Sequence, residues 1–460
     1  MGSGPAIRTT EGPSCIKRCG IALSAAKTTA SGGPSTLFYK VVIAVGSLSA
    51  SCLRRTHRVM LRVPVHKIQP GMILARPIPS PNDPYRYLLQ RDLEIPMDIV
   101  PRLKQLGILE VWVRHRDLEF LESIFDEGLG DRQREVYMVV RRNFESIIRS
   151  SSVELDLAGF QKAIAELFSF LKTGTSCDIL LQKLDAFDNY LMSHSTNICY
   201  LSLLLGMNLE RYLIDKRQHK TARQAKDLHL LALGCLLHDI GKMRIPTEIL
   251  RKPGKLSEEE FAVVRRHPIY GYEIVKGSIP APAAQVVVNH HQRFDGNGYP
   301  GRVDHQTGEQ LPPLAGEQIP VFSRIAIMAD VYDAATSQRC YSKAKHPAQV
   351  LHEMRTQCRG FFDPTVEAAF YRTVPAFPIG QVVTLSDGVE AVVVDFNPAH
   401  PAQPKVQCLR TPEGERFANP ALEELDLALY PDLTIVSVDG TDVQPFLALQ
   451  ESTEPALAFT

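Results

Sequence analysis

An excess of charge of one sign and paired cysteines are both missing from this sequence of 460 residues. Lys and Arg together number 51, and so do Asp and Glu, so a general role on nucleic acid or on a membrane surface has no support. The nine cysteines form no Cys-x-x-Cys pair, which argues against a disulfide framework and against a zinc finger. Scattered free thiols indicate a reducing compartment, and we expect the protein in the cytoplasm.

Long apolar runs and internal repeats are missing as well. The run from Val41 to Leu53 is interrupted by Gly and Ser and is shorter than the roughly 20 apolar residues of a membrane-spanning helix. We therefore expect no membrane span. Residues 1–59 are rich in Ser, Gly, Thr and Ala without periodicity, and we interpret them as a disordered tail or as sequence upstream of a natural start at Met60. No doubly wound, receiver-like module is visible, so the sequence does not indicate what regulates the protein.

The remaining residues predict three folded parts and a mainly α fold. Residues 60–125 alternate short apolar runs with Pro-Gly turns, which is typical of a small α/β accessory module. Residues 131–372 have helical periodicity and predict one all-helical domain. Residues 376–440 predict a small β module with a hairpin turn at Asp387-Gly388, followed by a tail over 441–460.

Within the helical part, two patterns are specific. Apolar residues recur at intervals of three and four from Leu155 to Leu171, as an amphipathic helix requires, and Leu230 to Leu237 is apolar on every face. Ser257 followed by Glu260 has the spacing of a capping box, which predicts a helix start.

Histidines and aspartates lie inside or beside these apolar helical stretches. Asp239, in Leu-Leu-His-Asp-Ile, is the most telling, because burying a carboxylate is costly unless it is paired or binds a metal. A lone histidine on an apolar face, such as His229, is more often a hydrogen-bonded core residue, but that explanation does not account for a whole set. The candidate metal ligands are His194, His238, Asp239, His267, His290, His291 and Asp330.

This set predicts a catalytic metal site. Neutral imidazoles mixed with carboxylates suit Fe, Mn, Zn, Co or Ni, and the absence of Cys from the set argues against a closed structural zinc site. One ion rarely uses seven protein ligands, whereas two divalent ions that share a bridging carboxylate would do so. Such a pair can hold both an attacking hydroxide and a phosphate oxygen, so the ligand set favours phosphoester hydrolysis.

A glycine-rich loop comes after the adjacent pair His290-His291. It reads Gln292-Arg-Phe-Asp-Gly-Asn-Gly-Tyr-Pro300, in which Gly296 and Gly298 permit a sharp turn and Pro300 fixes φ. A loop of this kind beside a metal site is suited to presenting phosphate-binding groups.

At these residues the sequence resembles the HD-GYP family of cyclic di-GMP phosphodiesterases, a branch of the HD metallohydrolase superfamily. The resemblance covers about residues 180–370 and includes His238-Asp239-Ile-Gly-Lys242, His267-Pro-x-x-Gly271, the loop from His290 to Pro300, and Ala329-Asp330-Val-Tyr-Asp333. It implies an HD-type helical catalytic domain, two divalent metal ions (Fe, Mn or a similar transition metal) and hydrolysis of cyclic di-GMP to pGpG, with GMP as a further product.

The resemblance also implies individual roles. His194, His238, Asp239 and Asp330 would hold one metal, and His267, His290 and His291 the other, with Asp239 bridging. Lys242, one helical turn past His238, would bind the scissile phosphate. The substrate mouth would be shaped by Arg293, Asp295, Gly296, Gly298, Tyr299 and Pro300. Weaker candidates are Arg324, Asp333 and Arg339, for which a structural salt bridge is the alternative.

Three departures from the family pattern bear on these roles. Tyr190 stands where some members have a glutamate that recruits a third metal, so we predict two metals. Gln292 and Phe294 replace the usual glutamate and tryptophan, which leaves the metal ligands intact and puts substrate preference in question.

Two other functions stay open. One is an HD hydrolase of another nucleotide, such as a hybrid cyclic dinucleotide or (p)ppGpp. The other is a catalytically silent scaffold that binds cyclic di-GMP or diguanylate cyclases, although retention of all seven ligands argues against it. The sequence leaves homodimerisation undecided.

Overall fold

The computed structural model describes residues 61–80, 86–106, 110–114, 127–149, 155–173, 190–250, 254–303, 309–337, 344–418 and 423–447, with the single residues 108, 252 and 307. The predicted tail over 1–59, Met60, Arg339 and residues 448–460 lie outside the described residues. Across the described ranges, no helix is long and apolar enough to cross a membrane.

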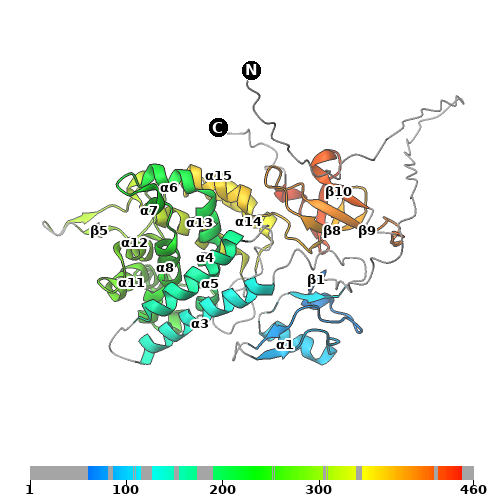
Figure 1. Cartoon of the computed structure of the whole chain (residues 1–460), viewed down its shortest axis with the longest axis horizontal. Coiled ribbons are helices and arrows are strands. Elements are labelled where there is room, and N and C mark those ends of the chain that lie inside the picture. The colour runs from blue at the N-terminus through cyan, green and yellow to red at the C-terminus, as the bar shows by residue number, and fades with distance from the viewer. Residues whose placement is uncertain are drawn as a thin grey trace, which may run out of the picture. The chain divides into compact units, whose positions relative to one another are not determined.

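The N-terminal module contains both strands and a helix, as predicted (Figure 1). Strand β1 (Leu61–Pro64) pairs antiparallel with β4 (Glu110–Val113), and β2 (Ile78–Pro79) pairs with β3 (Tyr87–Leu89). Helix α1 (Val100–Gln105) is the helical part of this module. A small core forms around buried side chains that include Leu74, Ile95 and Leu103.

The central part is helical, and Figure 1 shows its helices from α3 in cyan to α15 in yellow. Its main helices are α3 (Glu127–Arg149), α4 (Leu157–Thr173), α5 (Tyr190–Asn208), α6 (Glu210–Lys216), α7 (Ala222–Ala225), α8 (His229–Leu237), α9 (Thr247–Leu250), α10 (Glu258–Val264), α11 (His267–Val275), α12 (Ala281–Asn289), α13 (Val321–Thr336), α14 (Pro347–Gln357) and α15 (Pro364–Thr373). The first of these begins at Glu127, slightly before the predicted boundary at 131. The helical prediction for this part is confirmed, and a short strand pair, β5 (Arg302–Val303) with β6 (Gln310–Leu311), is added to it.

Helix α8 is the centre of this packing. Every residue from Leu231 to Leu237 is buried, and the helix packs against α5 on one side and α12 on another. Each fully buried aliphatic side chain contributes about 1.5–3 kcal/mol, so the apolar sequence makes α8 a fixed support for the end of the helix. His238 and Asp239 lie at that end.

The short 3-10 helix η4 (Ile240–Arg244) then runs directly against α11. A Cβ atom at Gly241 would lie 1.9 Å from the carbonyl oxygen of His267 and 2.4 Å from the amide nitrogen of Gly271. Only glycine permits this approach of two backbones. The contact brings Asp239 and His267 together although they are far apart in sequence.

The predicted capping box and the predicted β module are both present. The Ser257 hydroxyl accepts from the Glu260 amide at the start of α10, and the Glu260 carboxylate accepts in return. The C-terminal sheet has the order β10-β9-β8-β7-β11-β12. Its strands are β7 (Val382–Leu385), β8 (Glu390–Asp395), β9 (Lys405–Arg410), β10 (Glu424–Asp426), β11 (Ile435–Val438) and β12 (Thr441–Asp442).

The turn between β7 and β8 contains Asp387 and Gly388, as predicted, and Gly388 has a positive φ of 88°. The predicted end of the module at 440 was too early. Thr441 pairs with Val438, so the sheet continues into the segment predicted to be a tail.

Candidate metal centre

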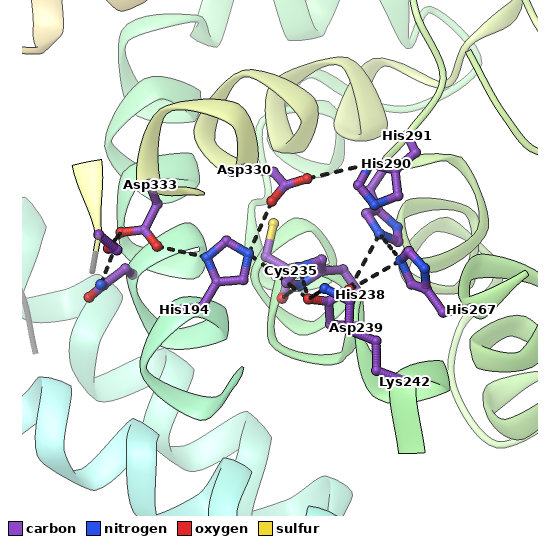
Figure 2. Close-up of polar contacts among 12 residues, drawn as sticks. His194, Cys235, His238, Asp239, Lys242, His267, His290, His291, Asp330 and Asp333 are labelled. Carbon is purple, nitrogen blue, oxygen red and sulfur yellow. Dashed lines mark hydrogen bonds and ion pairs between the residues drawn. The ribbon is translucent and has the colours of Figure 1, made fainter. Parts of the chain in front are cut away.

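The seven predicted ligands converge from five helices or helix ends (Figure 2). They share a position on or directly after an apolar helix, which explains why the chain can hold them rigidly. They are His194 in α5, His238 and Asp239 after α8, His267 at the start of α11, His290 and His291 after α12, and Asp330 in α13.

One group of ligand atoms gathers around one oxygen of Asp239. The Nε2 atom of His238 lies 3.3 Å from Asp239 Oδ2, and His194 Nε2 lies 3.9 Å from the same oxygen. His194 Nε2 is also 3.0 Å from Oδ1 of Asp330. Ligand atoms of His194, His238 and Asp239 all lie within 4.8 Å of one another, which is close enough to surround one ion.

A second group gathers around the other oxygen of Asp239. His267 Nε2 lies 3.2 Å from Asp239 Oδ1, and His290 Nε2 lies 3.8 Å from it. Together with His291, these residues also offer ligand atoms within 4.8 Å of one another. The two oxygens of Asp239 thus face two separate ligand groups, as a bridging carboxylate does in a two-metal site.

Backbone carbonyls fix the tautomers of three of these histidines. The Nδ1 atoms of His238, His267 and His290 lie 2.7, 2.7 and 2.8 Å from the carbonyl oxygens of Cys235, Val264 and Val287. A carbonyl oxygen only accepts, so each Nδ1 carries the proton, and each Nε2 directs a lone pair into the centre. This orientation by an outer partner is what metal-binding histidines require.

These lone pairs lack a protein donor. His238 Nε2 and Asp239 Oδ1 are buried and have no hydrogen-bond partner among the described residues. His267 Nε2 and His290 Nε2 are only 3.1 Å apart although both are acceptors. Buried acceptors facing one another are unfavourable unless a cation lies between them, so the residues present fit a metal.

The electrostatics agree with this conclusion. Burial would raise the pKa of Asp239, but Lys242 and His238 outweigh it and hold the pKa well below its usual range. Burial lowers the pKa of His290, and the neighbouring histidines lower it further. Ionised carboxylates and neutral imidazoles are the protonation states that bind metals.

His194 differs from His238, His267 and His290 because its Nδ1 contacts a side chain and not a backbone carbonyl. Its Nδ1 lies 2.7 Å from Oδ2 of Asp333. The other oxygen of Asp333, Oδ1, accepts a hydrogen bond from the side-chain amide of Asn197. Burial would lower the pKa of His194, but the hydrogen bonds to Asp330 and Asp333 raise it to about 9. Asp333 was predicted as a weak substrate-binding candidate with a structural role as the alternative; it is almost fully buried against His194, which favours the structural role.

Exposure divides the centre into a buried floor and an open side. The floor, with side chains at most 2% exposed, consists of His194, His238, Asp239, His267 and His290. On the open side, the side chains of His291, Lys242 and Asp330 are 26%, 21% and 10% exposed. A substrate can therefore reach the centre from the side of His291 and Lys242.

Lys242 lies on the open side, but not for the reason predicted from sequence. The α-helix ends at Leu237 and the chain continues as a 3-10 helix, so Lys242 is not one α-helical turn beyond His238. Its ammonium group instead lies 2.6 Å from Oδ2 of Asp239, the oxygen that faces His194 and His238. Lys242 is consequently in a position to meet a group bound at the centre.

The Gly-Tyr-Pro loop is held against His291. The Tyr299 amide donates to the His291 carbonyl over 3.0 Å, and the Tyr299 ring stacks on the imidazole with centroids 4.7 Å apart. The Tyr299-Pro300 peptide is cis. A Cβ at Gly298 would come within 2.6 Å of backbone atoms of Gln292, so the loop folds tightly over its own start. Tyr299 thus forms one wall beside the exposed ligand.

The side chain of Gln292 fixes this loop through two hydrogen bonds. Its amide nitrogen donates to the Pro300 carbonyl over 2.9 Å, and its amide oxygen accepts from the Leu314 amide over 3.0 Å. The side chain is almost fully buried, so Gln292 does not face a substrate. Gln292 therefore supports the position of the loop.

The outer part of the loop is held by Arg293 and Asp295. Their side chains form an ion pair, the Arg293 guanidinium lies 3.3 Å from the ring centroid of Phe361, and Asp295 accepts from the Asn297 amide. Gly296 has a positive φ of 81° in this turn. The prediction that these residues shape the substrate mouth stays a prediction.

Arg324 was predicted as a weak substrate-binding candidate, and its surroundings favour the structural alternative. The guanidinium is 5% exposed and donates to Asp363 over 2.6 Å and to the Tyr212 hydroxyl over 2.7 Å. Asp363 caps α15, so this ion pair joins α13 to α15 and not to the metal centre. Asp363 and Asn197 are residues that sequence reasoning missed, because neither lies in a recognisable motif.

Comparison with known proteins identifies two segments of the chain. A family described as an HD domain matches residues 207–366, and one described as a KOW domain associated with an HD domain matches residues 382–443. The first match begins after His194, whose place in the centre is therefore supported by the geometry alone.

Several bacterial proteins are similar to this part of the chain. Cyclic di-GMP phosphodiesterase PA4108 of Pseudomonas aeruginosa is 34% identical over 255 residues, which are 55% of this chain and 56% of that protein. The response regulator RpfG of Xanthomonas campestris, a cyclic di-GMP phosphodiesterase, is 37% identical over 150 residues, 32% of this chain and 37% of that protein. The 3'3'-cGAMP-specific phosphodiesterase 2 of Vibrio cholerae is 37% identical over 131 residues, 28% of this chain and 23% of that protein.

The chain thus spans about half the length of the first of these relatives and less of the others. The HD-domain match over residues 207–366 contains most of the ligand set and the Gly-Tyr-Pro loop. Residues 207–366 thus match the HD-domain family, and this chain, with its His-Asp ligand set and this loop, is similar over part of its length to proteins named cyclic di-GMP phosphodiesterases.

Proposed function

We propose that this chain is a metal-dependent phosphodiesterase that opens cyclic di-GMP to the linear dinucleotide pGpG in bacterial second-messenger signalling. The observation that carries the proposal is the pair of ligand groups sharing Asp239, in which buried Nε2 lone pairs face one another without a protein donor. The names of the relatives from Pseudomonas and Xanthomonas support the substrate.

Two divalent transition-metal ions, Fe, Mn or similar, are part of this proposal. His194, His238 and Asp330 would hold one, His267, His290 and His291 the other, and Asp239 would contact both. When bound, such ions lower the pKa of water and neutralise charge on a phosphate. The floor keeps the ligands dry and fixed, because each of its side chains is almost fully buried.

Lys242 would assist at the open side. Its ammonium group, now paired with Asp239, can donate to a phosphate oxygen that approaches the same carboxylate. A positive charge held at this point stabilises the extra negative charge of a phosphoryl transition state. The loop from Arg293 to Pro300 would form the rim around the substrate.

A hybrid cyclic dinucleotide is the second candidate substrate, and one observation favours it. The relative from Vibrio cholerae is named as specific for 3'3'-cGAMP, whereas those from Pseudomonas and Xanthomonas are named for cyclic di-GMP, so the relatives of this chain differ in the dinucleotide for which they are named. Cleavage of (p)ppGpp is disfavoured by the Gly-Tyr-Pro loop, and a silent scaffold by the complete ligand set.

Location and partners belong to the proposal as well. We place the protein in the cytoplasm, since the four described cysteines are all free and the proposed substrate is a second messenger. Diguanylate cyclases and a second copy of the chain are partners that the proposal permits and does not require.

The test is turnover of cyclic di-GMP by the purified full chain loaded with Mn²⁺ or Fe²⁺, with the products separated and the bound metal measured. We expect about two metals per chain and pGpG as product, with GMP followed over time. His238→Ala should lose both metal and activity. His229→Ala is the matched control, because His229 is an exposed histidine paired with Asp227. A fully metal-loaded protein that leaves cyclic di-GMP intact would contradict the proposal.

A further inference from the structure

An arginine stands beside the exposed metal ligand and has no assigned role. Arg265 is the C-cap of α10, and its guanidinium carbon lies 4.8 Å from the ring centroid of Tyr299. Tyr299 in turn stacks on His291. Two successive ring contacts therefore connect the open side of the metal centre to the Arg265 guanidinium.

The backbone fixes where this arginine stands. Its amide donates to the Phe261 carbonyl over 2.8 Å at the end of α10, and the next residue, Arg266, begins the turn into α11. The ligand His267 comes directly after it. The backbone of Arg265 is therefore fixed close to the ligand His267, as the backbone of a residue that positions a substrate should be.

The positive charge of Arg265 is not paired with a carboxylate within the described part of the protein. Arg265 is exposed, and no described carboxylate lies within ion-pair distance of it. The nearby acidic side chains are engaged elsewhere: Glu260 pairs with Lys252, and Glu259 accepts from the Ser257 hydroxyl. The guanidinium therefore keeps its hydrogen-bond donors for a ligand.

Aromatic rings lie near the guanidinium on two sides. Besides Tyr299, the ring of Phe261 has its centroid 5.8 Å from the guanidinium carbon, and Phe261 is 44% exposed. An exposed phenyl ring beside a planar cation suits a nucleobase, which can stack on the ring while its edge meets the donors. A phosphate would gain nothing from the ring.

We propose that Arg265, with Phe261 beneath the base, binds a guanine of the cyclic dinucleotide and selects it over adenine. Guanine presents two acceptors, O6 and N7, to a guanidinium fork, whereas adenine has an amino donor in place of O6. Arginine has only donors, so it matches guanine and repels adenine. This inference rests on the proposed function and adds the residue that reads the base.

The test compares wild type, Arg265→Ala, Arg265→Lys and Arg266→Ala with cyclic di-GMP, 3'3'-cGAMP and cyclic di-AMP. Arg265→Ala should raise KM for cyclic di-GMP by about 10- to 100-fold, the range of one bidentate base contact, with a much smaller change in kcat. Its preference for guanine over adenine should fall by a similar factor. Arg265→Lys should recover little of this loss, because a lysine lacks the planar fork.

Arg266→Ala is the matched control, since Arg266 is an exposed neighbour whose guanidinium lies over Tyr270 and not over Tyr299. It should behave as wild type. Metal content and Tm should be unchanged in all variants.

Three results would overturn the inference. They are an unchanged KM in Arg265→Ala, a loss of metal or Tm that shows a structural role, and an equal loss for all three dinucleotides, which would indicate a phosphate contact. If wild type turns over none of them, the proposed function fails separately, and Kd for cyclic di-GMP replaces KM. An unchanged Kd in Arg265→Ala then overturns the inference.

Discussion

The buried floor and the open side of the metal centre are built differently. In the floor, acceptors such as His238 Nε2 and Asp239 Oδ1 are buried and have no hydrogen-bond partner in the part of the chain that the structure describes, an arrangement that is unfavourable without cations. On the open side, Lys242 has an ion-pair partner and Tyr299 is stacked on His291, so both are ordered without any ligand. The floor thus supplies five of the seven candidate ligands, whereas the open side combines the candidate ligands His291 and Asp330 with Lys242 and Tyr299, which a substrate could contact. Substitutions should separate the two.

The largest effect is expected from Asp239→Asn in the floor. An amide replaces one of the two charged oxygens that face the ligand groups, and it turns a donor toward histidine lone pairs. Both metals should be lost, and activity should fall by about 10³-fold or more, because metal assistance is worth several kcal/mol. Metal analysis and turnover measure this.

The control for that variant is Asp227→Asn, which changes an exposed aspartate paired with His229. It should keep both metals and full activity. Retention of two metals by Asp239→Asn would contradict the bridging role.

Lys242→Met on the open side should have the next largest effect and a different character. The metals should stay, whereas kcat should fall by about 10²-fold, since a charge that stabilises the transition state is gone. Steady-state kinetics with parallel metal analysis measure this. Lys242→Arg should restore part of kcat, because it keeps the positive charge. Loss of metal in Lys242→Met would contradict this role and would show that the lysine supports metal binding.

Asp333→Asn tests whether the floor depends on its outer partners. The carboxylate that orients His194 becomes a neutral amide, and loss of such a partner typically weakens metal binding by about 10–100-fold. Only the site containing His194 should weaken, so a metal titration should show one tight and one weak site.

Ser337→Ala is the matched control for Asp333→Asn. Its hydroxyl donates to the other oxygen of Asp333 over 3.3 Å and does not contact His194. It should leave both affinities near wild type. Equal weakening of both sites by Asp333→Asn would be incompatible with its assigned role.

The smallest effect is expected from Gln292→Glu, which alters the support of the open side. A carboxylate would face the Pro300 carbonyl and lose the donor bond, at a cost of about 1–3 kcal/mol in the free energy of unfolding. Metal content should stay at wild type, while KM should rise modestly as the loop loosens. Chemical denaturation and kinetics measure both, and an unchanged stability would show that the hydrogen bond to the Pro300 carbonyl is not needed.

Local patterns in the sequence predicted most of the elements. The apolar run from Leu230 to Leu237 gave α8, the Ser257 capping box gave α10, and Asp387-Gly388 gave a hairpin, because each depends on neighbouring residues only. The seven candidate ligands were also identified from the sequence. Asp239 lies in an apolar segment, so its carboxylate requires a partner from elsewhere in the chain.

Where the structure differs from the first-choice expectation for a residue, the reason is a contact with another helix or a local change of helix type. Asp333 lies close to Asp330 in sequence but points to His194 on another helix. Arg324 pairs with Asp363 from α15. Lys242 was placed by α-helical spacing, but the helix changes to 3-10 geometry at that point. Sequence spacing describes one helix and cannot show which partner a neighbouring helix provides.

The sequence by itself determined the helical class of the central part, the ligand types and the Gly-Tyr-Pro loop, because composition and periodicity are local properties. Only the tertiary structure decided that the two oxygens of Asp239 face different histidines, and that Gly241 lets η4 touch α11. It also placed Arg265 beside Tyr299. The physical reason is that these relations join segments that packing alone brings together, and packing is a property of the whole folded chain.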